Sequence, residues 1–296
     1  MKGMPGLARQ RADRDGRFGP RMWRALRANK LALVGTMFLT VLVFMIVFQP
    51  WLGLPDPTAL DLSKQFLPPS LEHPLGTDEN GRDVLARIIA GGRVSLSVGL
   101  AGALLTVLVA SVFGVVSGYF GGAVDNVIMR FTDGLMAVPT IFLLMVIVAI
   151  WGSSPTVLIV SLAVTRWMDV ARLVRSEVLR FKGHEFVSAV RGLGASDGRV
   201  MFRHLLPQAV PSLIVATSLN IGYVMLIEAA LSFLGLGILP PTPSWGNMLS
   251  DSQYYIWAAP QLAVYPGVMI ALSVLAFNSI GDALRDVLDP RQQGRD

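Results

Sequence analysis

Residues 94–124 read VSLSVGLAGALLTVLVASVFGVVSGYFGGAV and contain no Asp, Glu, Lys or Arg. A helix needs roughly 20 apolar residues to cross a bilayer, because each residue rises about 1.5 Å along the axis. This stretch is longer than that minimum. It therefore predicts a transmembrane helix.

Further runs without Asp, Glu, Lys or Arg occur on both sides of this stretch. Hydrophobic residues make up 53% of the chain, charged residues 15%, and the mean hydropathy is +0.56. So many long apolar runs are not typical of a soluble domain of 296 residues. We expect an all-α, polytopic membrane helix bundle. The further runs are Leu31–Pro55, Gly134–Thr165, His204–Ile227, Ala229–Ser250 and Ser252–Gly281.

The placement of basic residues predicts how the bundle is threaded. Residues 1–30 carry nine Lys/Arg against two acidic residues, and residues 166–208 carry eight against four. Basic segments stay cytoplasmic, so an even number of crossings separates the two. We expect six transmembrane helices with both termini cytoplasmic. Their approximate ranges are 31–52, 95–119, 135–152, 155–174, 209–235 and 261–281. The fourth has the weakest apolar signal, because Arg166, Asp169 and Arg172 follow its apolar part.

This topology places residues 55–92 outside, the short loop 120–134 inside, and a tight external turn at Ser153–Pro155. Arg21–Lys30 is either an interfacial helix lying on anionic lipid or a solvated basic tail. The first apolar run is too long for a cleaved signal peptide. The predicted division is a basic cytoplasmic segment, 1–30, a transmembrane domain, 31–289, with a cytoplasmic loop at about 175–208, and a polar tail, 290–296.

Three glycines near the end of the second span recur at four-residue spacing. In membranes, small residues at this spacing allow two helices to approach closely. Glycine is also common in membrane helices generally, so a specific interface and simple composition both explain the pattern. The residues are Gly114, Gly118 and Gly122.

The cytoplasmic loop contains the most informative local pattern, with residues 180–211 reading RFKGHEFVSAVRGLGASDGRVMFRHLLPQAVP. Glu185–Arg191 is a candidate short helix, and Gly192 and Gly194 then favour a turn. Ser196 can cap a second short helix, which Pro207 is expected to break.

This loop is unusually apolar for a solvated segment. With the arginines beside them, its apolar side chains suit docking into a cleft of a partner protein. A self-packed loop lying against the membrane remains the alternative. The side chains are Phe186, Val187, Val190, Leu193, Phe202 and Leu205, with Arg191, Arg199 and Arg203.

The loop resembles the EAA motif of ABC importer permeases, which reads E-A-A, three residues, G, nine residues and I-x-L-P. Ala189, Gly194, Leu206 and Pro207 match this pattern. The departures are Ser188 for Glu, Val190 for Ala and His204 for Ile, with Glu185 one turn before the missing carboxylate. The resemblance implies that the loop inserts into a groove of a cytoplasmic ATPase. The residues assigned to this coupling are Glu185, Phe186, Val187, Ser188, Ala189, Arg191, Gly192, Gly194, Ser196, Arg199, Phe202, Arg203, Leu206 and Pro207.

Two other segments resemble signatures of the dipeptide, oligopeptide and nickel importer permeases, specifically their second, C-type subunit. They are His73–Leu100, HPLGTDENGRDVLARIIAGGRVSLSVGL, and Glu228–Asp251, EAALSFLGLGILPPTPSWGNMLSD. The resemblance implies a permease of the bacterial plasma (inner) membrane, surrounded by lipid. The implied partners are a homologous second permease in a heterodimer, two ABC ATPase subunits or domains, and an extracytoplasmic solute-binding protein. The solute stays open between peptides, a nickel chelate and other small molecules.

Patterns for chemistry within this chain fail. It has no cysteine and no G-x-x-x-x-G-K-[ST] loop, so we expect no thiol chemistry and no ATP bound in that manner. Residues 194–198 satisfy G-x-S-x-G, but no strand precedes them as a nucleophile elbow requires. His73, His184 and His204 form no ligand cluster.

We expect a non-enzymatic chain without cofactor or metal, with ATP and Mg on the partner ATPases. The net charge of +5 gathers beside membrane spans, which argues against nucleic acid.

Glu228 is the one acidic residue within the apolar fifth span. A carboxylate there is costly unless it faces water, a partner or the bundle interior. It either lines or gates the solute path, together with Asn220 on the same face, or anchors neighbouring helices by hydrogen bonds. Trp245, near Pro240, Pro241 and Pro243, is expected to anchor an external segment at the membrane interface.

Two other classes of protein compete with this interpretation. An ion-coupled secondary transporter needs several ionisable groups or broken helices within the membrane. An intramembrane enzyme needs a nucleophile and base, or a metal cluster, at membrane depth. For a secondary transporter, the sequence offers only Glu228 and the prolines near it. For an intramembrane enzyme, it offers no nucleophile with a base and no metal cluster.

Overall fold

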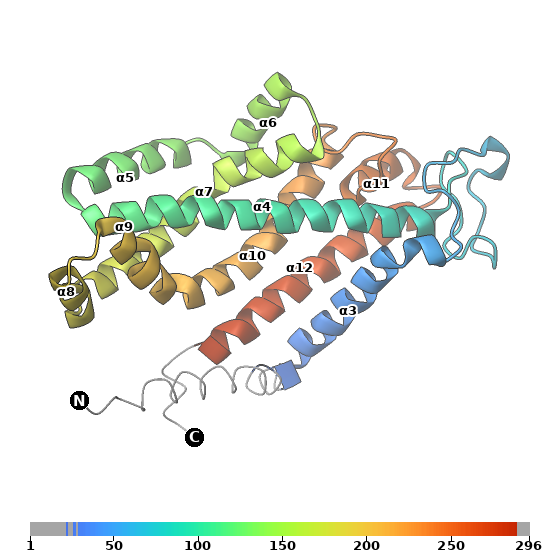
Figure 1. The fold of residues 1–296 in the computed structure, drawn as a ribbon. Coiled ribbons are helices and arrows are strands. Elements are labelled where there is room, and N and C mark those ends of the chain that lie inside the picture. Colours follow the sequence, from blue (N-terminus) through green and yellow to red (C-terminus); the bar gives the residue numbers. More distant parts are fainter. Residues whose placement is uncertain (1–21, 23–25, 28, 289–296) are drawn as a thin grey trace.

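The computed structural model describes residues 29–288 together with 22, 26 and 27, and regular structure in these residues is helical apart from one isolated bridge, Thr77 to Asp83 (Figure 1). The all-α prediction is confirmed for this part of the chain. The predictions for residues 1–28 and for the tail fall largely outside it. The α-helices are α3 (Lys30–Val47), α4 (Val84–Phe120), α5 (Gly122–Met136), α6 (Thr140–Trp151), α7 (Pro155–Lys182), α8 (Glu185–Gly192), α9 (Asp197–Arg199), α10 (Leu206–Phe233), α11 (Trp245–Ser252) and α12 (Gln261–Leu288). Shorter turns are the 3₁₀-helices η1 (Gln49–Trp51), η2 (Leu62–Lys64) and η4 (Gln253–Tyr255), and the π-helix η3 (Val200–Leu205).

Within the described residues, four helices are long and apolar enough to cross a bilayer. They are α3, α4, the continuous helix Asp197–Phe233, and α12. A fifth span arises if α5 and α6, which meet at 85°, count as one broken crossing. The remaining long helix, α7, has 28 residues but carries Arg166, Asp169 and Arg172. The helices therefore support a polytopic bundle, and the sixth predicted crossing depends on α7.

The third predicted span, 135–152, is not one straight helix, and the predicted loop 120–134 is not a loop. Residues 122–136 form α5, and α6 supplies only 12 residues. Such a helix is about 18 Å long, shorter than the hydrocarbon core of a bilayer. Pro139 stands at the N-cap of α6. Proline disfavours helical geometry in the residue before it, which explains a break at this point.

The longest element, α4, begins eleven residues before the predicted span, at Val84 rather than at residue 95. The carboxylate of Asp83 caps it by accepting a hydrogen bond from the backbone N–H of Ala86 at 2.7 Å. Arg93 donates a hydrogen bond to the Ile46 carbonyl at 2.9 Å. The basic residues near residue 90 are therefore bonded within the fold and do not mark the end of the helix.

Close packing of α4 on α7 uses two of the three glycines in the predicted pattern. A Cβ added at Gly114 would lie 2.6 Å from the Ala171 carbonyl oxygen, and one at Gly118 would lie 2.9 Å from the Val178 Cβ. At Gly122 a Cβ would meet nothing within 4 Å, so of the two explanations the close approach of helices within the chain does not apply to this glycine. Gly122 instead begins α5 with φ +53°.

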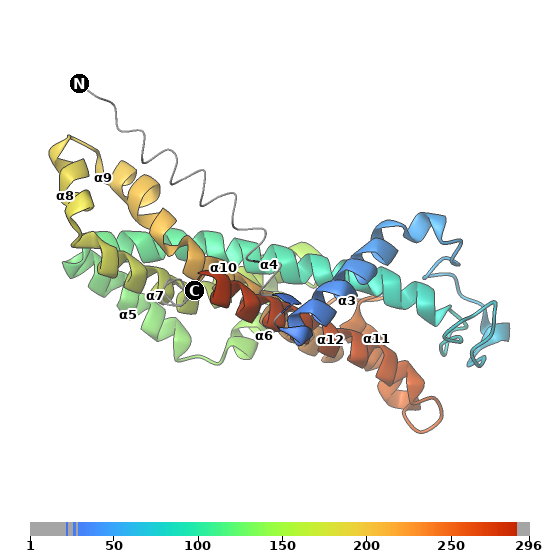
Figure 2. The ribbon, with the colours of Figure 1, turned by 90° about the horizontal axis from the view of Figure 1, so that it is seen from below.

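The two ends of the bundle carry different structures. Helices α8 and α9 lie at one end, and the segment 48–83 lies at the other (Figures 1 and 2). Because α4 runs between these ends, a single helix reaches both. The end that carries α8 and α9 and the end that carries the segment 48–83 are therefore connected through one continuous helix.

Candidate functional site

The predicted coupling loop begins with α8 and a glycine turn, in agreement with the sequence. Gly194 has φ +79°, a backbone conformation that side chains with a Cβ rarely adopt. Its N–H donates to the Arg191 carbonyl at 2.9 Å, and the N–H of Ala195 donates to the Val190 carbonyl at 3.3 Å. These two bonds form a Schellman motif, which ends a helix and reverses the chain.

After this turn, the structure corrects the prediction that Pro207 breaks a second short helix. Ser196 occupies the N-cap position, but its side chain makes no capping hydrogen bond. Helix α9 then continues through η3 directly into α10, with Pro207 in the first turn of α10. A π-helical turn widens the helix ahead of the proline, whose ring and missing N–H would otherwise interrupt it. The loop is thereby joined by continuous helix to α10.

The apolar side chains of the loop divide between two surroundings. Val187 and Leu205 are each 1% exposed and pack in a cluster with Val178 and Val200. Leu193 is 88% exposed and Phe202 45% exposed. One part of the loop therefore packs against the bundle, while Leu193 and Phe202 form an exposed apolar surface. Of the other predicted coupling residues, Leu206 is half-buried and the following lie at the surface: Glu185, Phe186, Ser188, Ala189, Arg191, Gly192, Gly194, Ser196, Arg199, Arg203 and Pro207.

A tyrosine that the sequence did not indicate ties this loop to α4. The Tyr119 hydroxyl donates a hydrogen bond to the Asp197 carboxylate. The Arg191 guanidinium lies 4.9 Å from the centre of the Tyr119 ring, and the Lys182 ammonium lies 5.9 Å from it. Both arrangements favour cation–π attraction. Nothing in the spacing along the chain connects residue 119 to residue 197, so only the fold reveals this contact.

The same end of the bundle is fastened by an ion pair between α5 and α7. Arg175 donates to both carboxylate oxygens of Asp125 at 2.6 Å, and the Ser117 hydroxyl donates to the same carboxylate. Bidentate pairing of this kind fixes orientation as well as distance. The start of α5 is therefore held against α4 and α7.

Glu228 is fully buried and hydrogen-bonded within the chain. Its carboxylate accepts from the Ser232 hydroxyl at 2.7 Å and from the Ser95 hydroxyl at 3.1 Å. Ser95 also accepts from the Trp245 N–H at 3.3 Å. The group thus joins α10, α4 and α11. Asn220 is 5% exposed, and its amide makes no hydrogen bond with the described residues, so the two predicted path residues are not hydrogen-bonded to each other.

Trp245 is buried, and the prediction that it anchors at the membrane interface is wrong. Its side chain is 0% exposed, and Nε1 donates to the Ile88 carbonyl at 2.9 Å. A Cβ at Gly92 would lie 2.9 Å from this indole ring. The glycines of α4 leave room for the ring, and α11 is held on α4 by it.

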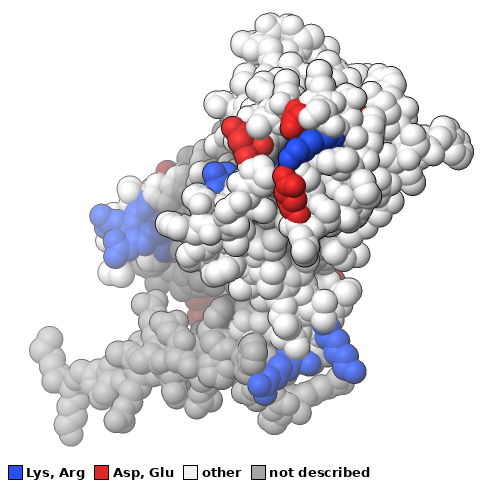
Figure 3. Space-filling view, turned by 90° about the vertical axis from the view of Figure 1, so that its right-hand side faces the viewer, with Lys and Arg blue, Asp and Glu red and all other residues white. Residues whose placement is uncertain are grey.

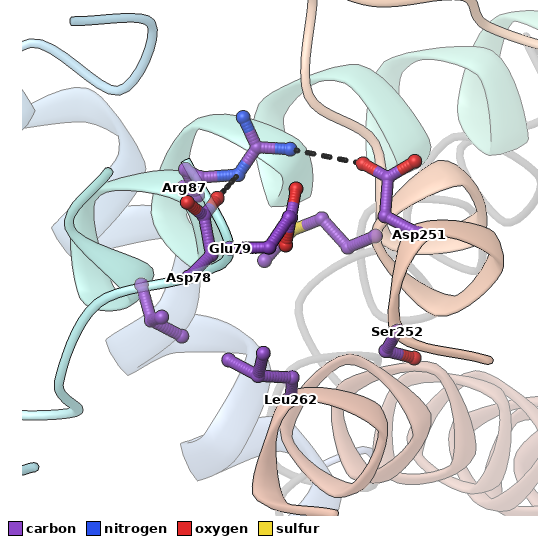
Figure 4. Close-up of a pocket in the computed structure, with 8 residues that line it drawn as sticks. Asp78, Glu79, Arg87, Asp251, Ser252 and Leu262 are labelled. Carbon is purple, nitrogen blue, oxygen red and sulfur yellow. Dashed lines mark ion pairs between the residues drawn. The ribbon is translucent and has the colours of Figure 1, made fainter. Parts of the chain in front are cut away.

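A cluster of charges lies at the N-terminal end of α4, where the two segments 73–100 and 228–251 meet (Figure 4). Arg87 forms ion pairs with Asp78, at 3.2 Å, and with Asp251, at 3.7 Å. Arg82 pairs with Asp78 and Glu79, each at 2.7 Å. The small cavity between them is lined by Asp78, Glu79, Val84, Arg87, Met248, Asp251, Ser252 and Leu262.

Acidic groups outnumber basic ones in this cluster, and Figure 3 shows acidic side chains around basic ones on this end of the molecule. Burial raises the pKa of Glu79, and the neighbouring carboxylates of Asp78 and Asp251 raise it further, against the lowering effects of a backbone hydrogen bond and Arg82. Burial also raises the pKa of Asp251, against the lowering effect of Arg87 and Arg82. Across the described residues, no group of His, Asp and Glu is arranged to hold a metal ion.

Family models and related proteins agree with this architecture. Residues 110–294 match the binding-protein-dependent transport system inner membrane component, and residues 18–69 match the N-terminal transmembrane domain of oligopeptide transport permease C. The dipeptide transport system permease protein DppC of Alkalihalophilus pseudofirmus is 40% identical over 92% of this chain and 89% of its own length. The chain belongs to the ABC importer permeases for peptides and nickel.

Within this permease family, the chain is a C-type subunit. The nickel transport system permease protein NikC of Escherichia coli is 42% identical over 88% of this chain and 93% of its own length. The oligopeptide transport system permease protein OppC of Bacillus subtilis is 36% identical over 90% of this chain and 87% of its own length.

Solved structures of ABC transporters share the fold of this permease. A chain of the inward-facing MetNI methionine ABC transporter aligns with a TM-score of 0.56 at 18% identity, covering 69% of this chain and 97% of its own. A chain of an amino acid ABC transporter aligns with a TM-score of 0.52 at 15% identity, over 68% of this chain and 94% of its own. These likenesses concern the fold alone.

Proposed function

We propose that this chain is one of the two membrane-spanning subunits of an ATP-driven importer for peptides or related small solutes. The observation that carries the proposal is the cytoplasmic loop of Glu185–Pro207, which exposes Leu193 and Phe202 while its other face is packed on the bundle. Exposed apolar side chains beside basic ones favour a protein partner. The partner that we propose is an ABC ATPase, which binds and hydrolyses ATP with Mg.

The proposed topology has six crossings with both termini in the cytoplasm. The bent pair α5 and α6 would form the third crossing, and α7 the fourth. The segment 48–83 would then face an extracytoplasmic solute-binding protein, and the loop would face the ATPases. We place the chain in the bacterial plasma membrane beside a homologous second permease.

Motion would pass from the ATPases to the membrane through two connections. One is the unbroken helix from α9 through η3 to α10. The other is the hydrogen bond from Tyr119 to Asp197, which ties the loop to α4. Closure of the ATPases would move the loop, and these connections would rock the spans against the second permease. The chain itself performs no chemistry in this scheme.

The solute belongs to the classes carried by the relatives, whose names state dipeptide, oligopeptide, nickel and glutathione transport. Most of these solutes are peptides, so we propose a peptide. Glu228 acts in this scheme as an internal anchor of α10, α4 and α11, because its carboxylate is fully buried and bonded to serines.

The experiment that tests this function is reconstitution in proteoliposomes of this chain with the proposed second permease, the ABC ATPases and the solute-binding protein. Uptake of labelled peptide should require ATP, and this chain alone should hydrolyse none. An ion-coupled secondary transporter would instead take up solute on an ion gradient without ATP. ATP hydrolysis by this chain free of other subunits would also contradict the proposal.

A further inference from the structure

In the proposed six-crossing topology, in which α7 is the fourth crossing, two charged residues of α7, Arg166 and Asp169, lie at membrane depth. Counted from Pro155 at 1.5 Å per residue, they are about 17 and 21 Å along the helix, inside a hydrocarbon layer about 30 Å thick. The packing of α7 on α4 gives the same depth. Leu162 contacts the position of Gly102, and Ala171 contacts that of Gly114. Both glycines belong to the uncharged stretch of α4, so the charged residues between these contacts lie beside it.

Asp169 lies on the surface of the chain, and Arg166 is partly exposed beside it. Arg166 Nη1 lies 3.0 Å from Asp169 Oδ2, and the side chains are 20% and 48% exposed. One turn further, Arg172 Nη2 lies 2.5 Å from Asp133 Oδ1 of α5, with side chains 42% and 52% exposed. Exposed charges at this depth are costly against lipid and belong to surfaces that face water or polar groups.

Other faces of the bundle are apolar and suit lipid. Their exposed residues include Val34 of α3, Leu108 of α4 and Val264 of α12, each more than half exposed. In the proposed topology the apolar faces are the ones that suit lipid, and the ion pairs of α7 and the end of α5 form a charged wall beside them. Glu228 and Asn220, the two residues that the sequence suggested for the path, are buried inside the chain and do not reach this wall.

Arg166 is held in position by stacking on an aromatic residue of α10. Its guanidinium lies 3.9 Å from the centre of the Tyr223 ring of α10, and its Nε atom is buried without a hydrogen-bond partner in the described structure. Stacking on an aromatic ring orients a guanidinium and leaves its edge available to a carboxylate. Arg166 is thus a preorganised group for an anionic ligand, and its present partner is Asp169.

We propose that Arg166 and Asp169 form a paired-charge site on the solute path, where Arg166 meets a carboxylate and Asp169 meets an ammonium group of a zwitterionic solute. This rests on the proposed importer function. The wall carries two guanidiniums and two carboxylates, so its charges balance and it favours neither a free cation nor a free anion. Arg166 and Asp169 pair with each other when the path is empty. A bound solute therefore replaces one ion pair by others, and the net free energy of binding is small. Weak binding of this kind lets a solute leave again.

The test uses the cysteine-free chain in the complete reconstituted transporter. Asp169→Cys, Arg166→Cys and the lipid-facing control Leu108→Cys are exposed to two water-soluble thiol reagents. These are an anionic sulfonatoethyl and a cationic trimethylammonium-ethyl methanethiosulfonate. Rates are divided by those of a free thiol in solution.

In the Asp169→Cys protein, Arg166 is left unpaired, so the anionic reagent should react at least tenfold faster than the cationic one. In the Arg166→Cys protein the order should reverse. Leu108→Cys should react with neither. If Asp169→Cys is as unreactive as Leu108→Cys while the wild-type transporter takes up peptide with ATP, the wall is covered and the inference is wrong, although the importer function stands. Equal normalised rates for both reagents would refute the charge pairing.

Discussion

The Tyr119 hydroxyl donates a hydrogen bond to the carboxylate of Asp197, across 78 residues of sequence. It joins the last turn of α4 to the first residue of α9. Arg191 from α8 lies over the same ring. Both short helices of the coupling loop therefore contact one side chain of the helix that spans the bundle from end to end.

Tyr119→Phe should weaken the transfer of motion without removing the ATPases. The substitution keeps the ring and deletes one hydrogen bond to a charged group, a loss of about 1.5–3 kcal/mol. We expect the ratio of peptide imported to ATP hydrolysed to fall about three- to tenfold. Tyr254→Phe, at an exposed tyrosine on the opposite end, is the matched control. An unchanged ratio in Tyr119→Phe would remove this residue from the mechanism.

Gly194→Val should disable the loop while leaving the membrane bundle intact. At φ +79° a β-branched residue is strained, by about 1–3 kcal/mol, although a Cβ there would touch nothing within 4 Å. We expect α9 to be misaligned, less ATPase to co-purify, and uptake to fall steeply with normal expression. Gly134→Val is the control, because it has equal space and lies in the helix α5. Wild-type uptake and co-purification in Gly194→Val would show that the loop is not the transmission element.

Glu228→Leu should destabilise the bundle, whereas Glu228→Gln should not. Leucine leaves the hydroxyls of Ser95 and Ser232 without their buried acceptor, which costs about 1–3 kcal/mol. Glutamine keeps an acceptor oxygen in the same place. We expect a lower thermal midpoint in detergent for the leucine variant only, and ATPase co-purification near wild type for the glutamine variant. A glutamine variant that is stable but cannot translocate solute would instead support a gating role.

Stability at the charge cluster beside the N-terminal end of α4 should depend on pH through Glu79. Because burial raises its pKa, the folded state holds this proton more tightly than the unfolded chain does. The contribution of Glu79 is thus favourable at low pH and is lost as the pH rises through the raised pKa. Glu79→Gln should therefore unfold at a higher temperature than wild type at pH 7, and this advantage should shrink towards pH 4.

The control for this pH experiment is Glu72→Gln at an exposed position. Its hydrogen bond with Lys64 lowers the pKa of Glu72, so any pH trend should run in the opposite direction. Both series can be followed by tryptophan fluorescence. A difference between Glu79→Gln and wild type that stays constant from pH 4 to pH 8 would contradict the burial argument.

The sequence predicted the helical membrane bundle and the turn at Gly194, because both depend on local properties. Apolar run length indicates a membrane helix, and two closely spaced glycines indicate a turn. The continuity through Pro207 was not predictable in this way, because a π-helical turn absorbs the proline. The burial of Trp245 was missed for a related reason. Its pocket is formed by Gly91 and Gly92, more than 150 residues away in the chain.

The charged wall shows a second limit of sequence reasoning. Arg166 and Asp169 first counted only against the fourth span, because composition treats every intramembrane charge as a penalty. Glu228 attracted attention for being alone in an apolar run. In the fold, Glu228 is enclosed by serine hydroxyls, whereas Asp169 is exposed and Arg166 is partly exposed. Which side of a helix is covered depends on its neighbours.

The most direct test of the coupling claim is labelling of two single cysteines, Ser188→Cys in α8 and Thr58→Cys in the segment 48–83, with a membrane-impermeant maleimide. Both side chains are exposed. We predict that Thr58→Cys labels only from outside the cell. Ser188→Cys should label only from the inner face of inverted vesicles, and bound ATPases should slow its reaction at least tenfold. Labelling of Ser188→Cys from outside, or at the same rate with and without the ATPases, would contradict the account.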